Sequence, residues 1–183
     1  MRIIAGSRKG ARIYAPKGTD TRPTGDRVRE AAFNLIGPGR VEEASVLDLF
    51  AGSGAMGLEA LSRGAARATF VESDRAACQA INRNLDKLEL EGATVLRQNA
   101  LTALRTDVRA GTRYDLVLVD PPYRRFSSLQ NALIQLLPEI LAPSGLLVVE
   151  TAAGEEPDLQ PLTKRTSRRY GSSRLTLFEH ADE

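Results

Sequence analysis

The residues with the most specific chemistry in this sequence are four consecutive ones, Asp120-Pro121-Pro122-Tyr123, which directly follow an apolar segment. Each proline lacks an N–H and has a fixed φ, so the pair ends a strand and stiffens the chain beyond it. The Asp120 carboxylate and the Pro121 carbonyl are then two rigid hydrogen-bond acceptors beside the flat face of Tyr123. Two such acceptors can hold both N–H groups of an amine on a planar base, and the aromatic ring can stack on that base.

An amine held in this way can be aimed at an incoming methyl group, and most of the catalysis would come from positioning and electrostatics. We therefore predict a catalytic group formed by Asp120, Pro121, Pro122 and Tyr123. The proton that the amine loses could pass to Asp120 or to water, and the reaction needs no metal. The alternative is a turn that ends a strand, with a tyrosine in the core. The combination of all four residues at the end of a strand favours the catalytic interpretation.

A second group of residues, from Asp48 to Gly57, predicts a site for a nucleoside-containing cofactor. Gly52, Gly54 and Gly57 have the spacing G-x-G-x-x-G between an apolar strand and a helix, which is the context that the motif requires. Glycines let the backbone turn tightly and pass close to a ligand. Glu72 ends the next strand, twenty positions after Gly52, where a carboxylate can accept hydrogen bonds from both hydroxyls of a ribose.

The glycine spacing alone fits NAD as well as S-adenosylmethionine, and two further features favour the second cofactor. Asp48 lies at the carboxyl end of the first strand, where a carboxylate suits an ammonium and a sulfonium but not a pyrophosphate. Asn99 follows the third strand, where an amide could contact the adenine edge, although it fits a helix cap equally well. The predicted cofactor-binding residues are Asp48, Ala51, Gly52, Ser53, Gly54, Glu72, Ser73, Asn99, Ala100 and Asp120. An NAD-dependent oxidoreductase stays an alternative, but it leaves the Asp-Pro-Pro-Tyr run without a role.

The order of the elements around these residues predicts an α/β fold. From residue 45 onward, apolar segments that are typical of strands alternate with segments of helical periodicity. The expected strands are 45–50, 68–72, 94–98, 114–120 and 145–150, and the expected helices are 55–63, 75–88, 101–109 and 128–141. The strands are apolar on both faces, which is typical of a parallel sheet between two layers of helices. We therefore expect a doubly wound, mostly parallel sheet, the Rossmann-like fold of class I S-adenosylmethionine-dependent methyltransferases.

The two ends of the chain depart from this alternation. Residues 162–170 and 174–179, separated by Gly-Ser-Ser, predict a C-terminal hairpin that adds an antiparallel strand to the sheet edge. Residues 2–15 predict a short hairpin or an extended arm, and residues 24–36 predict a helix capped by Thr24 or Asp26. We expect residues 1–40 to form a basic arm and helix within the same domain as the methyltransferase core, residues 41–183.

Length and composition limit the kind of protein. The 183 residues fit one domain of ordinary size. No apolar run approaches the roughly 20 residues of a membrane helix, and the N-terminus lacks the apolar stretch of a secretory signal. Cys78 is the one cysteine, so neither an intrachain disulfide nor a cysteine zinc cluster can form. We expect a cytoplasmic monomer with no metal ion and no membrane partner.

Basic residues gather near the N-terminus. Residues 1–30 hold eight Lys and Arg against three Asp and Glu, a net charge of +5, whereas the net charge of the entire chain is +2. A basic segment of this kind can contact the phosphates of a nucleic acid. A solvated basic segment explains the charge alone at least as well.

With these motifs, the chain resembles the RsmD family, bacterial 16S rRNA guanine-N2 methyltransferases, over nearly its whole length. The matching segments are 2–6, 22–30 with Phe33-Asn34, 48–57, 58–65, 70–72 and 120–123. The segment 22–30 discriminates best, because many amine methyltransferases share the others. Gly25 and Met56 depart from the residues usual in the family, which are a polar residue and a leucine.

The resemblance implies transfer of a methyl group from S-adenosylmethionine to the exocyclic N2 of a guanine in 16S rRNA, within a partly assembled small ribosomal subunit. A base must leave its stack to enter such a site, and the basic arm would bind phosphates. The predicted RNA contacts are Arg8, Lys9, Arg12, Arg22, Arg27 and Arg124; for Arg124, ordinary surface charge fits equally well. The alternatives are methylation of DNA adenine or of a protein glutamine, and a non-catalytic RNA-binding factor of ribosome assembly.

Overall fold

The computed structural model describes residues 1–15, which form an N-terminal arm, and residues 25–122 and 126–181. Three of the predicted site residues, Arg22, Tyr123 and Arg124, lie outside these ranges, and so does Thr24, one of the two candidate helix caps. None of the helices in these ranges has the length and apolar character that a membrane span requires.

Seven strands form one sheet at the centre of the protein. They are β1 (Ser45–Leu49), β2 (Arg67–Glu72), β3 (Ala93–Arg97), β4 (Tyr114–Val119), β5 (Leu141–Ala152), β6 (Thr163–Tyr170) and β7 (Ser173–Glu179). Their order across the sheet is β3-β2-β1-β4-β5-β7-β6. The strands β1 to β5 pair in parallel, and β7 pairs antiparallel with both β5 and β6. The predicted parallel sheet with a C-terminal antiparallel hairpin is confirmed.

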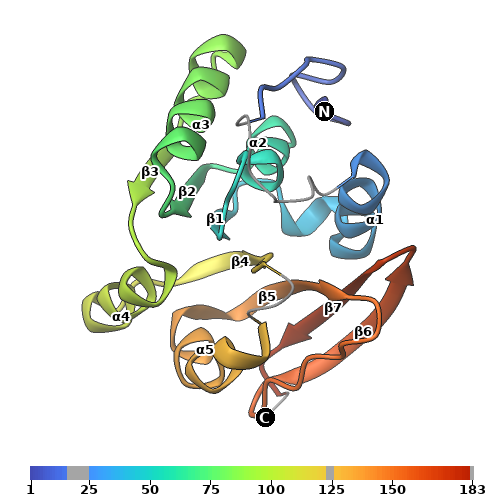
Figure 1. Ribbon diagram of the computed structural model, residues 1–183, viewed down its shortest axis with the longest axis vertical. Coiled ribbons are helices and arrows are strands. Elements are labelled where there is room, and N and C mark those ends of the chain that lie inside the picture. The colour runs from blue at the N-terminus through green and yellow to red at the C-terminus, as the bar shows by residue number, and fades with distance from the viewer. Residues whose placement is uncertain (16–24, 123–125, 182–183) are drawn as a thin grey trace.

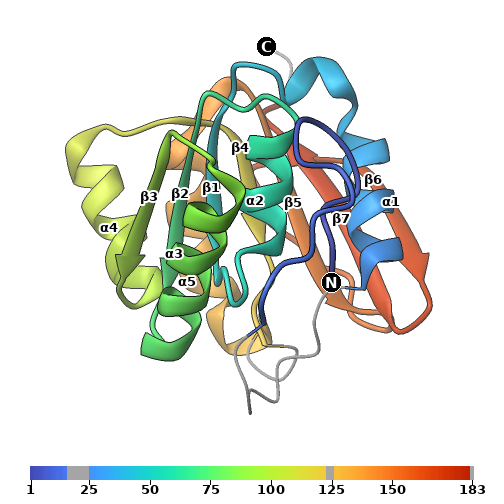
Figure 2. The ribbon, with the colours of Figure 1, turned by 90° about the horizontal axis from the view of Figure 1, so that it is seen from above.

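Helices cover both faces of the sheet, as Figure 1 and Figure 2 show. They are α1 (Asp26–Ile36), α2 (Ala55–Ser62), α3 (Arg75–Leu88), α4 (Ala100–Ala110) and α5 (Phe126–Ile140), with a short 3₁₀ turn at Pro38–Arg40. The helices α1, α2 and α3 lie on one face together with the arm, and α4 and α5 lie on the other. Each face has its own apolar core, and β1 and β4 contribute residues to both cores, which explains why their sequences are mostly apolar.

The junction between α5 and β5 differs from the expectation. The strand begins at Leu141, directly after the helix, rather than at Gly145. Leu141 pairs with Tyr114, and the register of the two strands then shifts. The extra residues on β5 therefore bulge out of the ladder, and they include Pro143 and Gly145, which are typical of a turn when only the sequence is considered.

The start of the first helix also differs. The helix begins at Asp26, its N-cap is Gly25, and no side chain among the described residues caps its first turn. The prediction of Asp26 as the cap is therefore wrong. The Asp26 carboxylate accepts a hydrogen bond from the Arg29 guanidinium at 2.9 Å. The side chain therefore forms an ion pair with a residue one turn along the helix and, within the described residues, does not accept a hydrogen bond from the backbone.

The N-terminal arm is held against α2 by backbone groups. The carboxylate of Glu59, a fully buried residue of α2, accepts hydrogen bonds from the N–H of Ile4 at 2.8 Å and of Ala5 at 3.0 Å. A Cβ on Gly6 would lie 1.7 Å from the carbonyl oxygen of Ser62, so the arm and the end of the helix meet where no side chain fits between them. The arm is therefore anchored to the same helix that follows the glycine loop.

Candidate active site

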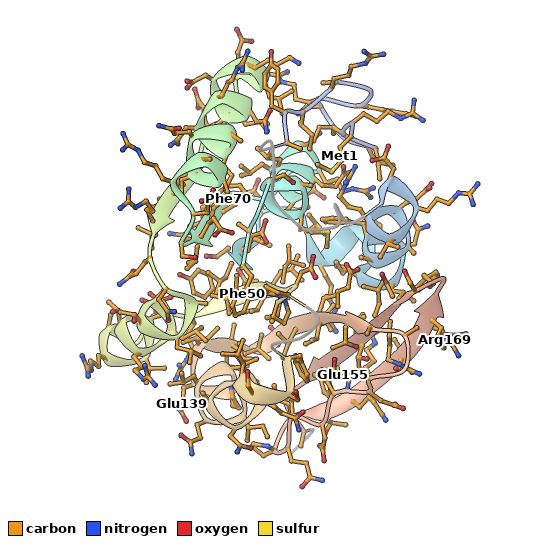
Figure 3. All side chains as sticks on the ribbon, in the orientation of Figure 1. Met1, Phe50, Phe70, Glu139, Glu155 and Arg169 are labelled. Atoms are coloured by element: carbon orange, nitrogen blue, oxygen red, sulfur yellow. The ribbon has the colours of Figure 1, made fainter. Side chains whose placement is uncertain are left out.

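The candidate site lies at the carboxyl ends of the parallel strands, where ligands bind in open α/β sheets. The loop after β1 is tight, because Phe50, Gly52 and Gly54 have positive φ angles of 63°, 53° and 75°. Figure 3 shows Phe50 where the ends of β1 and β4 meet. Among the described residues, the nearest atom to a Cβ on Gly52 would be the Phe50 carbonyl oxygen, 4.0 Å away. The loop, with buried Ala51 and half-buried Ser53, therefore leaves space for a ligand on this side.

The third glycine of the motif has a different task. A Cβ on Gly57 would lie 2.3 Å from the ring of Phe70 and 3.1 Å from the Asp48 carboxylate. Figure 3 shows Phe70 between β2 and the helices that cover it. The Gly57 N–H donates a hydrogen bond to Asp48 Oδ2 at 2.8 Å. The absence of a side chain thus lets α2 pack closely on the sheet and lets its backbone hold the acid of β1.

Asp48 is buried, with 3% of its surface exposed. Burial raises the pKa of its carboxyl group from 3.8 to about 7; the hydrogen bond from Gly57 lowers the pKa, and the negative charge of Glu72 raises it, each with a smaller effect. A cation next to this carboxyl group would favour its charged form. The ammonium and the sulfonium of S-adenosylmethionine are such cations, so the chemistry of this position fits the predicted cofactor.

Glu72 ends β2 beside the glycine loop. Its Oε2 accepts a hydrogen bond from the Gly52 N–H at 2.8 Å, and its Oε1 accepts one from the Asp74 N–H at 2.8 Å. The Ser73 hydroxyl lies 3.4 Å from Oε1 and donates to it. These bonds fix the carboxylate against the loop and take three of its about four acceptor positions, of which the 3.4 Å contact with Ser73 is the longest and the one that a ribose hydroxyl would replace. Its place agrees with a site for the two hydroxyls of a ribose.

Asn99 is the N-cap of α4. Its side-chain Oδ1 accepts hydrogen bonds from the N–H of Leu101 at 3.0 Å and of Thr102 at 3.3 Å. Ala100 is the first residue of the helix and is buried. The structure therefore contains the cap that was one of the two interpretations of Asn99, and contact of Asn99 and Ala100 with an adenine stays a prediction.

A small pocket, open to solvent, lies at the carboxyl ends of β1, β4 and β5. Three acids and five apolar residues line it: Asp48, Asp120, Glu150, Met56, Leu118, Val119, Val148 and Leu175. Asp120 directly follows β4, Pro121 is buried and Pro122 is exposed. Asp48 from the predicted cofactor set and Asp120 from the predicted catalytic set therefore line one pocket.

Glu150 is the acid of this pocket that no predicted site includes. It is buried near the carboxyl end of β5. The sequence did hold a signal, because Glu150 follows the apolar run Leu-Leu-Val-Val just as Asp120 follows the apolar residues of β4. Within the described ranges, no three His, Cys, Asp or Glu side chains form a group that could hold a metal ion.

The predicted RNA-binding residues that the structure describes lie on the arm and on α1. Lys9 and Arg12 are exposed on the arm, and Arg27 is exposed on α1. Arg8 is partly buried, and its guanidinium donates hydrogen bonds to carbonyl oxygens at the carboxyl end of α3. Arg8 therefore has a structural contact that the sequence did not predict, whereas the other three residues lie on the surface as expected.

Two basic residues of α3 extend the basic surface of the arm. The Arg83 guanidinium lies 3.7 Å and the Lys87 ammonium 4.7 Å from the centre of the Tyr14 ring, and Lys87 also donates a hydrogen bond to the Arg12 carbonyl oxygen at 2.6 Å. Tyr14 is 37% exposed. Arg83 and Lys87 could not be singled out from the sequence, because exposed basic residues are common on the outer face of any helix. Only the packing of the arm brings them to Tyr14.

The sheet order, the glycine loop and the acids at the strand ends define the class of the protein. It has the class I S-adenosylmethionine-dependent methyltransferase fold. The model of the family described as Conserved hypothetical protein 95 matches residues 1–179. The chain belongs to this family, which is the RsmD family that the motifs indicated, and that identification is confirmed.

Individual relatives agree with the family. Ribosomal RNA small subunit methyltransferase D of Escherichia coli (strain K12) is 45% identical over 153 residues, which cover 82% of this chain and 74% of the relative. The solved structure of yhhF from Escherichia coli superposes with a TM-score of 0.85 at 39% identity and covers 98% of this chain and 97% of that one. SMU.776, solved in complex with SAH, has a TM-score of 0.68 at 18% identity and covers 83% of this chain and 48% of that one, a likeness of fold alone.

Proposed function

We propose that the protein transfers a methyl group from S-adenosylmethionine to the exocyclic N2 of a guanine in 16S rRNA of the small ribosomal subunit. The observation that carries the proposal is the pocket that Asp48 and Asp120 share, beside the glycine loop that binds Glu72. The relative named for methylation of small-subunit ribosomal RNA supports the substrate class. The Asp-Pro-Pro-Tyr run supports an amine as the acceptor, and the resemblance to the RsmD family supports N2 of guanine.

Two acids of the chain bind the cofactor in this mechanism. When bound, S-adenosylmethionine supplies a methyl group on a positively charged sulfur. The Asp48 carboxylate provides the negative charge for its cationic groups, and Glu72 accepts hydrogen bonds from its ribose hydroxyls. The open side of the glycine loop at Gly52 receives the nucleoside.

Asp120 and Pro121 position the acceptor amine. The Asp120 carboxylate and the Pro121 carbonyl accept hydrogen bonds from its two N–H groups. These bonds draw the nitrogen lone pair out of conjugation with the ring and aim it at the methyl carbon. The cofactor, held by Asp48 and Glu72, would supply the methyl group and leave as a neutral thioether, and the amine nitrogen would lose one proton to Asp120 or to water. The negative charge of Asp120 stabilises the positive charge that develops on the nitrogen. Tyr123, outside the described residues, would stack on the base.

The exposed basic residues of the arm and of α1 bind the RNA around the target base. Lys9, Arg12 and Arg27 are exposed and would contact phosphates, and Arg22 and Arg124, outside the described residues, would do the same. Contact with phosphates positions the RNA and carries no base specificity. We expect the protein to act as a cytoplasmic monomer on the assembled or assembling small subunit.

The test of this proposal is methyl transfer from radiolabelled S-adenosylmethionine to small ribosomal subunits that lack their natural modifications. Naked 16S rRNA, DNA and bulk protein serve as parallel substrates, and nucleoside analysis identifies the product. We expect N2-methylguanosine from the subunits. Label in DNA or protein alone would overturn the substrate, and the absence of label everywhere would favour a non-catalytic factor of ribosome assembly.

Asp120→Ala tests the role of the acid in gripping the amine. We expect the turnover rate to fall by about 100-fold or more, because the amine then has only one of its two fixed acceptors, while calorimetry shows that cofactor binding survives. Asp86→Ala, at an exposed position of α3, is the control for removal of an acid elsewhere. A wild-type rate in Asp120→Ala would remove this residue from the reaction.

A further inference from the structure

Glu150 is an acid with no task in the proposed mechanism. It is 6% exposed, and it lines the same pocket as Asp48 and Asp120. The hydroxyl of Ser173, on β7, donates a hydrogen bond to Glu150 Oε1 at 2.8 Å. This bond orients the side chain, and burial of a carboxylate is costly unless hydrogen bonds compensate it. A buried acid on the wall of a ligand pocket is therefore a candidate for contact with the ligand.

The pairing of β4 with β5 sets Glu150 beside Asp120. Val119 pairs with Val149 in the parallel ladder, so the next residues along the two strands, Asp120 and Glu150, are neighbours as well, with strands about 4.8 Å apart. Paired residues of parallel strands point to the same face of the sheet. The residues two positions earlier on both strands belong to the core on the face that α2 covers, so both acids point to that face.

We propose that Glu150 is a specificity-determining residue, which accepts a hydrogen bond from N1–H of the target guanine while Asp120 and Pro121 hold the N2 amine. This inference rests on the proposed function, because it requires a guanine in the pocket. Guanine carries N1–H and the N2 amine as adjacent donors on its Watson–Crick edge, the edge through which proteins read unstacked bases. Two acids on neighbouring strands match two adjacent donors.

The same two acids reject the other bases that carry an exocyclic amine. Adenine has an unprotonated N1 next to its amine, and cytosine has an unprotonated N3, so a nitrogen lone pair would face the Glu150 carboxylate. Because neither the carboxylate nor the ring nitrogen carries a proton to share, no hydrogen bond forms between them, and binding of adenine or cytosine is weakened. A site built to accept a hydrogen bond from its substrate discriminates strongly against analogues that lack the donor.

The test compares guanosine with 2-aminopurine riboside at the target position of the RNA. The analogue keeps the amine on C2, but its N1 carries a lone pair in place of a proton. The wild-type protein should prefer guanosine by about 100-fold or more in kcat/KM. Glu150→Gln keeps the size of the side chain and adds an amide N–H that can donate to N1 of the analogue. This variant should lose about 10- to 100-fold on guanosine, and its preference for guanosine should fall by at least the same factor.

A second readout needs no cofactor, and a matched variant removes the structural explanation. The fluorescence of 2-aminopurine reports insertion of the base into the pocket, and Glu150→Gln should bind the analogue RNA more tightly than the wild type does. Ser173→Ala removes the hydrogen bond to Glu150 but keeps the carboxylate, so it should retain the preference for guanosine. Glu150→Asp, with the charge on a shorter side chain, should lose rate on guanosine and still prefer it.

Three results would contradict this assignment in distinguishable ways. An unchanged preference and an unchanged fluorescence titration in Glu150→Gln would overturn it and leave the proposed function intact. An equal loss of preference in Ser173→Ala and Glu150→Gln would overturn it as well, because Glu150 would then act through the position of β7. If the wild-type protein methylates no guanosine, the proposed function fails and the specificity role fails with it.

Discussion

Asp48 and Glu72 both lie near the carboxyl end of a strand, but their surroundings differ. Asp48 is buried beneath α2 and receives a hydrogen bond from the helix backbone. Glu72 is partly exposed and is held by the N–H groups of the glycine loop and of Asp74. Burial raises the pKa of Asp48 to about 7, so its charge depends on pH in the physiological range, and this dependence gives two measurable effects.

The first effect is on the stability of the cofactor-free protein. The pKa of Asp48 is about 7 in the folded protein and 3.8 as the ordinary value, so the folded state binds the proton more tightly. The free energy of unfolding contributed by this group therefore falls as pH rises from about 4 to about 7, and it is level above pH 7. Between pH 5 and pH 7.5 we expect the Tm of the wild type to drop relative to that of Asp48→Asn by roughly 5 °C. If calorimetry showed the same change of Tm with pH in both proteins, Asp48 would not be a buried carboxyl group that titrates in this range.

The second effect is on cofactor affinity. A cation next to Asp48 favours the ionised form, so binding releases a proton and becomes stronger as pH rises toward 7. We expect the affinity of the wild type for S-adenosylmethionine to rise about ten-fold between pH 5.5 and pH 7, and the affinity of Asp48→Asn to stay level and low. Calorimetry in buffers of different ionisation enthalpy would detect the released proton. A flat profile in the wild type would place the cationic groups of the cofactor away from Asp48.

The helix α2 connects the glycine loop with the N-terminal arm. Its first turn binds Asp48, and Glu59 on its second half binds backbone N–H groups of the arm. Glu59 is also 3.5 Å from the fully buried guanidinium of Arg29 and 2.8 Å from that of Arg63. One short helix thus holds together the arm, α1 and the loop, and removal of one partner would leave a buried charge without compensation.

Gly6→Ala tests how strongly the arm depends on its close approach to α2. A Cβ at this position would overlap the Ser62 carbonyl oxygen, so we expect the arm to detach and the Tm to fall by roughly 5 °C or more. Gly10→Ala is a matched control, because Gly10 has the same φ of 83° but no atom of the described residues within 4 Å of the added Cβ. Limited proteolysis should cut the arm of Gly6→Ala first. Equal reductions of Tm in the two variants would mean that backbone strain, and not packing, sets the cost.

The sequence alone predicted the presence of every strand in the sheet and of the helices α1 to α5 that cover it. It also predicted the places of the two acids that belong to recognisable motifs. Asp48 and Asp120 could be predicted because local chemistry, glycines in one case and prolines in the other, marks their places. The register shift before Leu146 could not, since it depends on how β5 pairs with β4. The partners of Glu150 and Glu59 could not either, because they come from segments distant in the sequence, β7 for Glu150 and the arm for Glu59. For Glu150, the apolar run before it indicated only a place at the end of a strand.

The distribution of charge over the entire protein gives the prediction for RNA binding. Lys9 and Arg12 are exposed on the arm, and the basic residues of α3 lie beside them. Reversal of both charges, Lys9→Glu with Arg12→Glu, should weaken binding of the RNA. It should also reduce the slope of log affinity against log salt by about 0.7 to 0.9 for each phosphate that the arm no longer neutralises. Fluorescence anisotropy at several salt concentrations measures both quantities.

The control for this prediction is an equal change of charge elsewhere. Arg168 and Arg169 are exposed on β6, at the end of the sheet, and the double reversal Arg168→Glu with Arg169→Glu changes the net charge by the same amount. We expect the salt slope of this control to stay near that of the wild type. Equal slopes for both double variants would mean that the RNA responds to net charge and not to the arm.

The strand β6 lies at one edge of the sheet, and this position has a consequence for solubility. An edge strand offers N–H and C=O groups to which the edge of another copy could add, which is a route to aggregation. Four exposed cations lie along this strand: Lys164, Arg165, Arg168 and Arg169. Lys164 and Arg165 also form ion pairs with Glu156 and Glu179, so the repulsion between identical edges comes chiefly from Arg168 and Arg169. Replacement of these two by threonine should leave the circular dichroism spectrum unchanged and increase light scattering on concentration. The cations then protect the open end of the sheet, and salt that screens them should reproduce part of the same effect.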